Sequence, residues 1–159
     1  MRLEPYLFFN GRTEEAPAFY QTALGAETLS VLHFKDSPEG VNAAPEWLDK
    51  VMHATFRIGQ SLIMASDGVN AAPQVFSGFS ISRAADDVES GHKIFAALSN
   101  GGDVRMAWQR TFWTSGFGMV SDRFGIPWMV SVVITPTEQQ PAHTIAIRVT
   151  HCRISYSGN

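Results

Sequence analysis

The sequence predicts an α+β protein made of two βαβββ modules whose strands form a curved mixed sheet. Three observations carry this prediction. The same order of strand and helix patterns occurs in both halves of the chain. Glycines close the helix and the last hairpin at matching places in each half. An aromatic-rich stretch at residues 106–134 divides at turn signals into short strands, as expected for a meander. A repeated supersecondary unit of this size indicates internal duplication.

The first half begins with an apolar strand at residues 3–10. A helix follows, for which we expect the Thr13 hydroxyl to cap free backbone amides and Gly25 to form the C-terminal cap. Residues 36–48 carry prolines and glycine and predict a surface loop. The remaining strands are expected at residues 26–35, 51–58 and 61–66.

The second half repeats this order. A strand is predicted at residues 75–83, and Asp86 or Asp87 is expected to cap a helix that runs through Leu98. Three strands then complete the module at residues 104–113, 117–122 and 126–134. The helix-ending glycines of the two halves are further apart than the hairpin glycines, by roughly the length of the 36–48 loop. That loop therefore looks like an insertion in the first half.

These patterns divide the chain into a first module at residues 1–70 and a second at 71–135. Residues 136–159 have no counterpart in the repeat. We expect them to form either an added edge strand or a disordered or non-native tail, because unsupported termini are commonly mobile.

Composition excludes several classes of function. The net charge is −3 and no run of Lys or Arg occurs, so the sequence lacks the basic surface that nucleic-acid binding requires. Apolar runs are too short to span a membrane, and no apolar leader is present at the start. The single cysteine, Cys152, excludes an internal disulfide and a thiolate zinc cluster. These features predict a cytoplasmic protein without nucleic-acid or membrane partners.

Several segments occur together in an order that is typical of one protein family. They are Pro5-Tyr6-Leu7-Phe8-Phe9-Asn10-Gly11, Ala18-Phe19-Tyr20, Leu24-Gly25-Ala26-Glu27, His53-Ala54, Ile58-Gly59, Met64-Ala65-Ser66-Asp67, Ser77-Gly78-Phe79, Met106-Ala107-Trp108-Gln109, Phe112-Trp113, Gly116-Phe117-Gly118 and Phe124-Gly125-Ile126-Pro127-Trp128-Met129. Through them, residues 1–135 resemble the PhnB-like branch of the vicinal-oxygen-chelate (glyoxalase/bleomycin-resistance/dioxygenase) superfamily. This branch is often labelled 3-demethylubiquinone 3-methyltransferase.

The resemblance implies a cup-shaped sheet on which metal-using relatives place four His, Glu or Gln ligands. Matched residue by residue, those positions hold Pro5, Met64, Gly78 and Met129. Proline and glycine have no side-chain donor, and a thioether is a poor ligand for hard or borderline divalent ions. We therefore expect a cup with no metal and no cofactor.

Strand alternation from those four positions gives the expected lining of the cup. It adds Leu7, Phe9, Leu62, Ser66, Ser80 and Ser131, with aromatic walls from the meander. His53 is either a base or ligand contact or a hydrogen-bonded structural residue. Asp67 and Asp122 are read as turn formers. The predicted ligand-binding residues are Phe9, His53, Met64, Ser66, Trp108, Phe112, Trp113, Met129 and Ser131.

The leading hypothesis is a metal-independent, homodimeric protein that binds a small, partly apolar or aromatic molecule, in the manner that the resemblance to bleomycin-resistance proteins implies. The alternative is a metal-dependent isomerase, lyase or dioxygenase with ligands elsewhere, for example His53 with Asp67. A third hypothesis is a cup filled by its own side chains, with the dimer as the functional unit. Methyl transfer is disfavoured because Gly116-Phe117-Gly118 enters a strand, unlike a nucleotide-binding turn.

Overall fold

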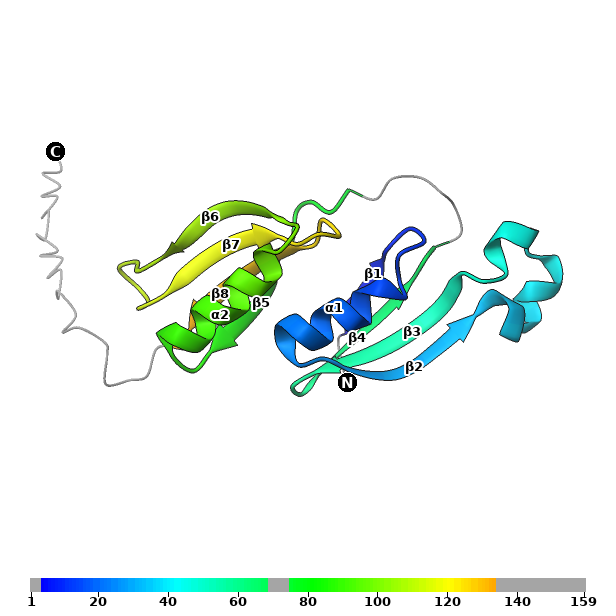
Figure 1. The fold of residues 1–159 in the computed structure, drawn as a ribbon, viewed down its shortest axis with the longest axis horizontal. Coiled ribbons are helices and arrows are strands. Elements are labelled where there is room, and N and C mark those ends of the chain that lie inside the picture. Colours follow the sequence, from blue (N-terminus) through cyan, green and yellow to red (C-terminus); the bar gives the residue numbers. More distant parts are fainter. Residues whose placement is uncertain (1–3, 69–74, 134–159) are drawn as a thin grey trace, which may run out of the picture.

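A computed structural model describes residues 4–68 and 75–133 as two four-stranded sheets, each accompanied by one helix (Figure 1). The predicted module boundary near residue 70 and the predicted tail at residues 136–159 lie outside the described residues. Within the described part of the chain, no helix has the length and apolar character needed to cross a membrane.

The first sheet has the strand order β1-β4-β3-β2. β1 runs parallel to β4, and the other neighbouring strands are antiparallel. Three short 3₁₀ helices fill the predicted insertion between β2 and β3. The elements are β1 (Tyr6–Phe8), α1 (Glu15–Leu24), β2 (Glu27–His33), η1 (Phe34–Asp36), η2 (Pro38–Asn42), η3 (Pro45–Trp47), β3 (Val51–Ile58) and β4 (Ser61–Ser66).

The second sheet repeats this topology as β5-β8-β7-β6, with β5 parallel to β8. The duplicated βαβββ unit predicted from the sequence is therefore confirmed. Several strands are shorter than predicted. The strand expected at residues 75–83 begins only at Ile81, the one expected at 104–113 ends at Gln109, and the one expected at 3–10 covers only Tyr6–Phe8. The elements are β5 (Ile81–Ala85), α2 (Val88–Ser99), β6 (Asp103–Gln109), β7 (Phe117–Ser121) and β8 (Pro127–Val132).

Two of the three predicted helix caps are present. Gly25 ends α1 in the left-handed conformation at φ 68°, which glycine adopts without steric cost. Asp87 caps α2, and its side chain and that of Ser90 each accept a hydrogen bond from the other's backbone amide. Thr13 does not cap α1. Its hydroxyl donates instead to the Asp67 carboxylate, because Thr13 lies before the N-cap position, which Glu14 occupies.

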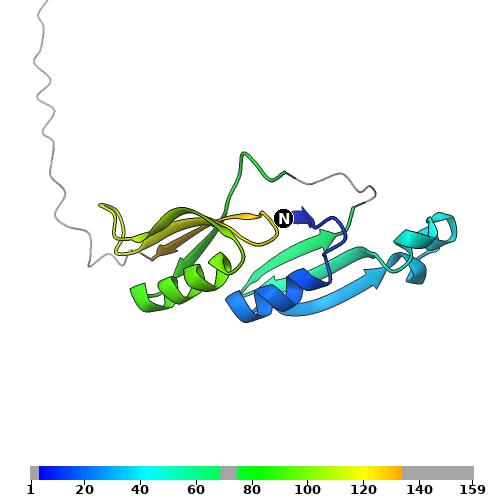
Figure 2. The same ribbon diagram turned by 45° about the horizontal axis from the view of Figure 1, so that its top comes forward.

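The two modules share one hydrophobic core along their helices. In both views α1 and α2 lie beside each other on the same side of the two sheets (Figures 1 and 2). Tyr20 from α1 and Trp128 from β8 are both buried there and their rings are in contact. Within residues 4–68 and 75–133, the opposite, open face of each sheet carries no α-helix (Figures 1 and 2).

Candidate functional site

The strand registers define matching rows of residues on the two open faces. Tyr6 lies opposite Met64 in the first sheet, and Ser82 lies opposite Met129 in the second. Met64 and Met129 thus occupy equivalent places in the duplicated unit. Pro5 and Gly78 were expected beside the two methionines. This expectation was wrong, because Tyr6 pairs with Met64 and Ser82 pairs with Met129. Pro5 precedes β1, and Gly78 lies before β5 at φ +77°.

The donor atoms of this row do not fit the metal centre that the superfamily resemblance implies. The row offers a phenol, a serine hydroxyl and two thioethers, whereas the resemblance implies imidazole, carboxylate or amide ligands. Divalent ions such as Mg²⁺ or Zn²⁺ prefer the latter donors. Among residues 4–68 and 75–133, no group of three or more His, Cys, Asp or Glu side chains is placed to hold an ion.

The open face of β1 carries Tyr6 and Phe8 and not the expected Leu7 and Phe9. Leu7 and Phe9 are buried at 3% and 4% exposure, whereas Tyr6 and Phe8 are exposed at 39% and 43%. The expectation that Leu7 and Phe9 line the cup was therefore wrong. The expectation placed Pro5 on the cup-facing side of the strand. A shift of one residue exchanges the two faces of a strand, so it placed Leu7 and Phe9 on the wrong face. Phe9 packs instead against Tyr20 and Phe124.

A β-bulge shapes the open face of β3. Leu32 pairs with His53 and His33 with Val51, so Met52 is the extra residue. Val51 and Ala54 are fully buried, while Met52 and His53 between them are only partly buried. Two consecutive side chains thereby avoid the core, which regular alternation does not allow.

His53 is hydrogen-bonded through both ring nitrogens. Nδ1 lies 3.1 Å from the Tyr6 hydroxyl, and Nε2 lies 3.1 Å from Oγ1 of Thr55. The first bond holds the phenol of Tyr6 on the open face. Thr55 holds the imidazole of His53 through Nε2, and Nδ1 in turn fixes the position of the Tyr6 hydroxyl.

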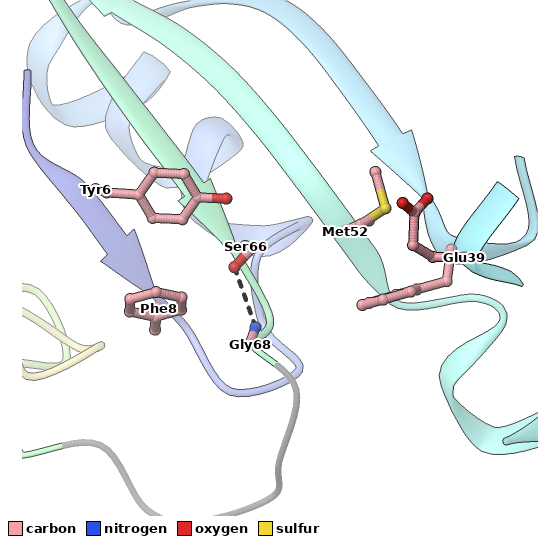
Figure 3. A pocket seen from close by; sticks show the side chains of 7 residues that line it. Tyr6, Phe8, Glu39, Met52, Ser66 and Gly68 are labelled. Carbon is pink, nitrogen blue, oxygen red and sulfur yellow. Dashed lines mark hydrogen bonds between the residues drawn. The ribbon is translucent and has the colours of Figure 1, made fainter. Parts of the chain in front are cut away.

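A pocket of about 420 Å³ opens on this face of the first sheet (Figure 3). Tyr6 and Phe8 lie on one side of it, Met52 and Glu39 on the other, and the Ser66 hydroxyl lies between them. Phe34 and Glu39 come from η1 and η2, so the insertion forms part of one wall. The lining residues are Tyr6, Phe8, Phe34, Glu39, Met52, Ser66 and Gly68.

Of the predicted ligand-binding residues, only Ser66 lines this pocket. Its Oγ accepts a hydrogen bond from the Gly68 amide at 3.2 Å. The contributions of Phe34 and Glu39 were missed by sequence reasoning. The signal that could have found them is the insertion itself, because a segment present in one module alone gives that module a wall the other lacks.

The predicted residues of the second module lie elsewhere. Met129 and Ser131 alternate with the buried residues of β8 and face its open side. Trp108 packs against Phe95 on α2, and a Cβ added at Gly91 would lie only 2.5 Å from its ring. The sequence expectation that Trp108 walls the cup together with Phe112 and Trp113 is therefore not met within one chain.

Phe112 and Trp113 lie in the connection between β6 and β7. Phe112 is 94% exposed, and its ring meets that of Trp113 at 4.6 Å. Trp113 in turn contacts Phe117 at the start of β7. These rings extend the apolar surface of the second sheet and do not reach the pocket of the first.

Asp67 is a buried carboxylate that fixes the end of β4 beside the pocket. Its Oδ1 accepts from the Thr13 amide at 2.9 Å and from the Thr13 hydroxyl at 2.6 Å, and its Oδ2 accepts from the Val51 amide at 2.8 Å. All these atoms are buried. Asp67 therefore joins three segments of the first module and is more than the turn former expected from the sequence.

Asp122 has the corresponding role at the junction between the modules. Its Oδ2 accepts hydrogen bonds from the Tyr20 hydroxyl at 2.6 Å and from Trp128 Nε1 at 2.8 Å, and its Oδ1 accepts from the backbone amides of Phe124 and Ile126. Burial raises the pKa of Asp122 above its ordinary value, although these hydrogen bonds act in the opposite direction. Burial and the nearby carboxylate also raise the pKa of Tyr20.

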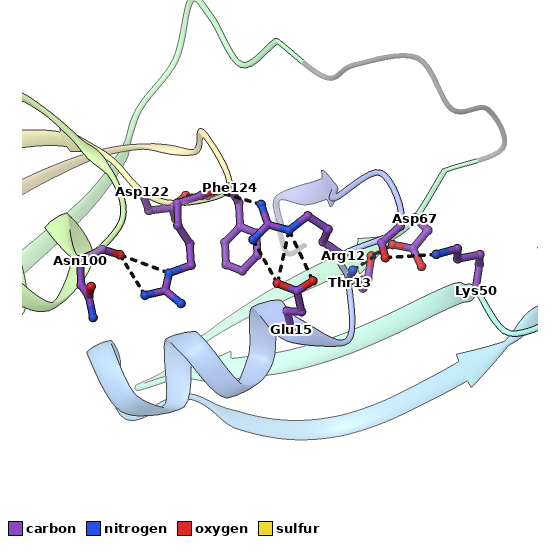
Figure 4. Close-up of polar contacts among 10 residues, drawn as sticks. Arg12, Thr13, Glu15, Lys50, Asp67, Asn100, Asp122 and Phe124 are labelled. Atoms are coloured by element: carbon purple, nitrogen blue, oxygen red, sulfur yellow. Dashed lines mark hydrogen bonds and ion pairs between the residues drawn. The ribbon is translucent and has the colours of Figure 1, made fainter.

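Two arginines reinforce the junction from outside (Figure 4). The Arg12 guanidinium lies 4.6 Å from the centre of the Phe124 ring and donates to the Arg123 carbonyl. Arg123 lies 4.6 Å from the Phe19 ring and donates to the Asn100 carbonyl. Each module thus supplies an arginine that stacks on an aromatic ring of the other.

The paired βαβββ modules define the fold of the glyoxalase/bleomycin-resistance/dioxygenase superfamily. A protein of that description from Burkholderia phytofirmans has the same fold at a TM-score of 0.56 and 15% identity, over 81% of this chain and 97% of its own. A PhnB protein from Bacillus cereus aligns at a TM-score of 0.72 and 22% identity, over 84% and 100%. The protein PA1353 from Pseudomonas aeruginosa aligns at 0.74 with 41% identity, over 83% and 97%.

The family within that superfamily follows from the sequence. Residues 1–131 match the model of the family described as 3-demethylubiquinone-9 3-methyltransferase. The protein YjdN of Escherichia coli K12 is 41% identical over 149 residues, which are 89% of this chain and 99% of YjdN. The chain belongs to this family, which is the PhnB-like branch of the superfamily.

Proposed function

We propose that this protein binds a small, partly apolar or aromatic molecule without a metal ion, and that the pocket of the first module holds the ligand. The proposal rests above all on one observation: the pocket presents three aromatic rings and a thioether beside a few polar groups, the hydroxyls of Tyr6 and Ser66 and the carboxylate of Glu39. Concave sites of this composition and size hold small molecules mainly by apolar burial, and a few polar groups set the orientation.

The alternative reading, a metal-dependent isomerase, lyase or dioxygenase, receives less support. It would need His, Asp or Glu donors near one another, and its suggested pair was His53 with Asp67. Both ring nitrogens of His53 are hydrogen-bonded to protein groups, and Asp67 is held by three protein donors. Asp67 is also only 2% exposed, so coordination of an ion by this pair would compete with the hydrogen bonds of both side chains and need a route into the core.

We propose further that the protein is a homodimer. The open face of the second sheet carries Met106, Met119 and Met129 in one cross-strand row, and the first sheet exposes Tyr6 and Phe8. Apolar faces of this kind mark interaction surfaces. A two-fold dimer that sets the first sheet of one copy against the second sheet of the other covers both faces and forms two identical cups.

Binding is tested by titrating the metal-stripped protein with benzyl alcohol, with ligand-observed NMR as the readout. Phe8→Ala removes one wall of the pocket and should weaken binding by about two- to tenfold, since one aromatic contact is lost. Phe79→Ala is the matched control, because Phe79 is 44% exposed, close to the 43% of Phe8, and lies outside the pocket. Equal affinities of the two variants, or no binding by the wild type, would contradict the proposal.

A further inference from the structure

We infer that the pocket of the first module prefers a ligand that joins an apolar or aromatic body to a positively charged amine. The inference rests on the proposed function, because it specifies the chemical class of ligand for the same pocket. It depends on the one charged residue of the lining, Glu39, and on the rings around it.

Glu39 gives the pocket an uncompensated negative charge. It is exposed, and it has no ion-pair or hydrogen-bond partner within residues 4–68 and 75–133. The basic side chain of Lys35 in η1 is already paired with Asp49 at 2.8 Å. Since the lining contains no lysine or arginine, the field in the pocket favours a cation.

The rings of the pocket favour a cation for a second reason. The ring centres of Tyr6 and Phe8 lie 5.2 Å apart, and the ring centre of Phe34 lies 6.1 Å from that of Trp47, in an edge-to-face arrangement. Aromatic faces attract an ammonium group through their quadrupole. Tyr6 and Phe8 lie across the pocket from Glu39 (Figure 3), so the ammonium group of a ligand held between the two sides faces the carboxylate on one side and aromatic rings on the other.

The charged wall belongs to the insertion and has no counterpart in the second module. Phe34 and Glu39 come from consecutive 3₁₀ helices that pack closely, because a Cβ added at Gly40 would lie 2.2 Å from the Phe34 carbonyl oxygen. The matching connection between β6 and β7, residues 110–116, contains Arg110 and no acidic residue. The preference for a cation is therefore a property of the first module.

The experiment compares benzylamine, which is protonated at neutral pH, with benzyl alcohol, its neutral analogue of similar size. We expect the wild type to bind benzylamine more tightly. Glu39→Gln should weaken benzylamine by about three- to tenfold, the range for one exposed charge contact with cation–π support, and leave benzyl alcohol unchanged. Glu46→Gln is the control, because it removes the same charge from an exposed site of the same insertion that does not line the pocket.

The outcomes separate the inference from the proposed function. If benzyl alcohol binds in a Phe8-dependent manner but benzylamine binds no more tightly, the preference for a cation is wrong and the proposed function stands. The same conclusion follows if Glu39→Gln and Glu46→Gln behave alike. If neither probe binds the wild type, both the inference and the proposed function are contradicted.

Discussion

Asp122 joins the two modules through buried hydrogen bonds. Its carboxylate accepts hydrogen bonds from the Tyr20 hydroxyl of α1 and from Trp128 Nε1 of β8, so one side chain connects the two modules within the core. A buried carboxylate is tolerated when donors surround it, and the removal of one donor leaves a charge that is incompletely satisfied.

Tyr20→Phe should destabilise the protein by about 1.5–3 kcal/mol at neutral pH, the range for a hydrogen bond to a charged group. Denaturant unfolding followed by circular dichroism measures this loss. Tyr6→Phe is the control, because it removes a hydroxyl from a partly exposed tyrosine that bonds to His53. A Tyr20→Phe variant as stable as Tyr6→Phe would show that the buried bond contributes little.

The Tyr20→Phe deficit should also depend on pH. Burial holds the folded-state pKa of Asp122 above the value of 3.8 expected in the unfolded chain. The ionised Asp122 carboxylate therefore lowers the free energy of unfolding. This destabilisation is present in full above the folded-state pKa and disappears as the pH falls toward the unfolded-state pKa. Loss of the Tyr20 donor raises that pKa further, so the stability difference from wild type should shrink on acidification. A difference that stays constant or grows would contradict this.

At the scale of the elements, α2 begins where the sequence predicted. Asp87→Ala should lower the melting temperature, because the free amide of Ser90 loses its acceptor. Asp86→Ala, one residue earlier and without such a bond, should leave it nearly unchanged. The backbone hydrogen bond from Ser90 lowers the pKa of Asp87, so the advantage of wild type over Asp87→Ala is complete above about pH 4 and is lost as the pH falls through the depressed value. Equal melting temperatures for the two variants would refute the cap.

The insertion of η1–η3 is the element that makes the first module different from the second. Gly40→Ala places a methyl group against the Phe34 carbonyl oxygen and should displace Glu39 from the pocket. Benzylamine binding should then fall at least as far as in Glu39→Gln. Val41→Ala, at a neighbouring residue that is 86% exposed, should bind as wild type does. Unchanged binding by Gly40→Ala would mean that the insertion does not position Glu39.

Local signals predicted more of these elements than of the site. The positive-φ cap at Gly25 and the Asp87 cap follow from residue types at helix ends, which act within one turn. The faces of β1 depended on a single starting residue, and the choice of Pro5 inverted them. The bulge at Met52 and the position of Phe34 and Glu39 in the pocket wall opposite β1 arise from contacts between distant segments, which periodicity does not encode.

At the scale of the whole molecule, the two sheets lie side by side, and no α-helix of the described residues covers their open faces. If a second copy covers them, Met119→Lys should shift the protein toward the monomer, because a charge would be buried in the middle of the apolar row. Size-exclusion chromatography with light scattering measures the mass. Ala96→Lys, on the exposed surface of α2, should leave the dimer intact. A monomeric wild type would contradict the dimer.

We propose that this member of the superfamily binds its ligand without a metal ion, because the row Tyr6–Met64 and Ser82–Met129 lacks the donors that divalent ions prefer. The most direct measurement is the metal content of protein purified without chelator, determined by inductively coupled plasma mass spectrometry. We expect far less than one divalent ion per chain. One tightly held ion per chain, retained through dialysis and lost only together with the fold or with ligand binding, would contradict it.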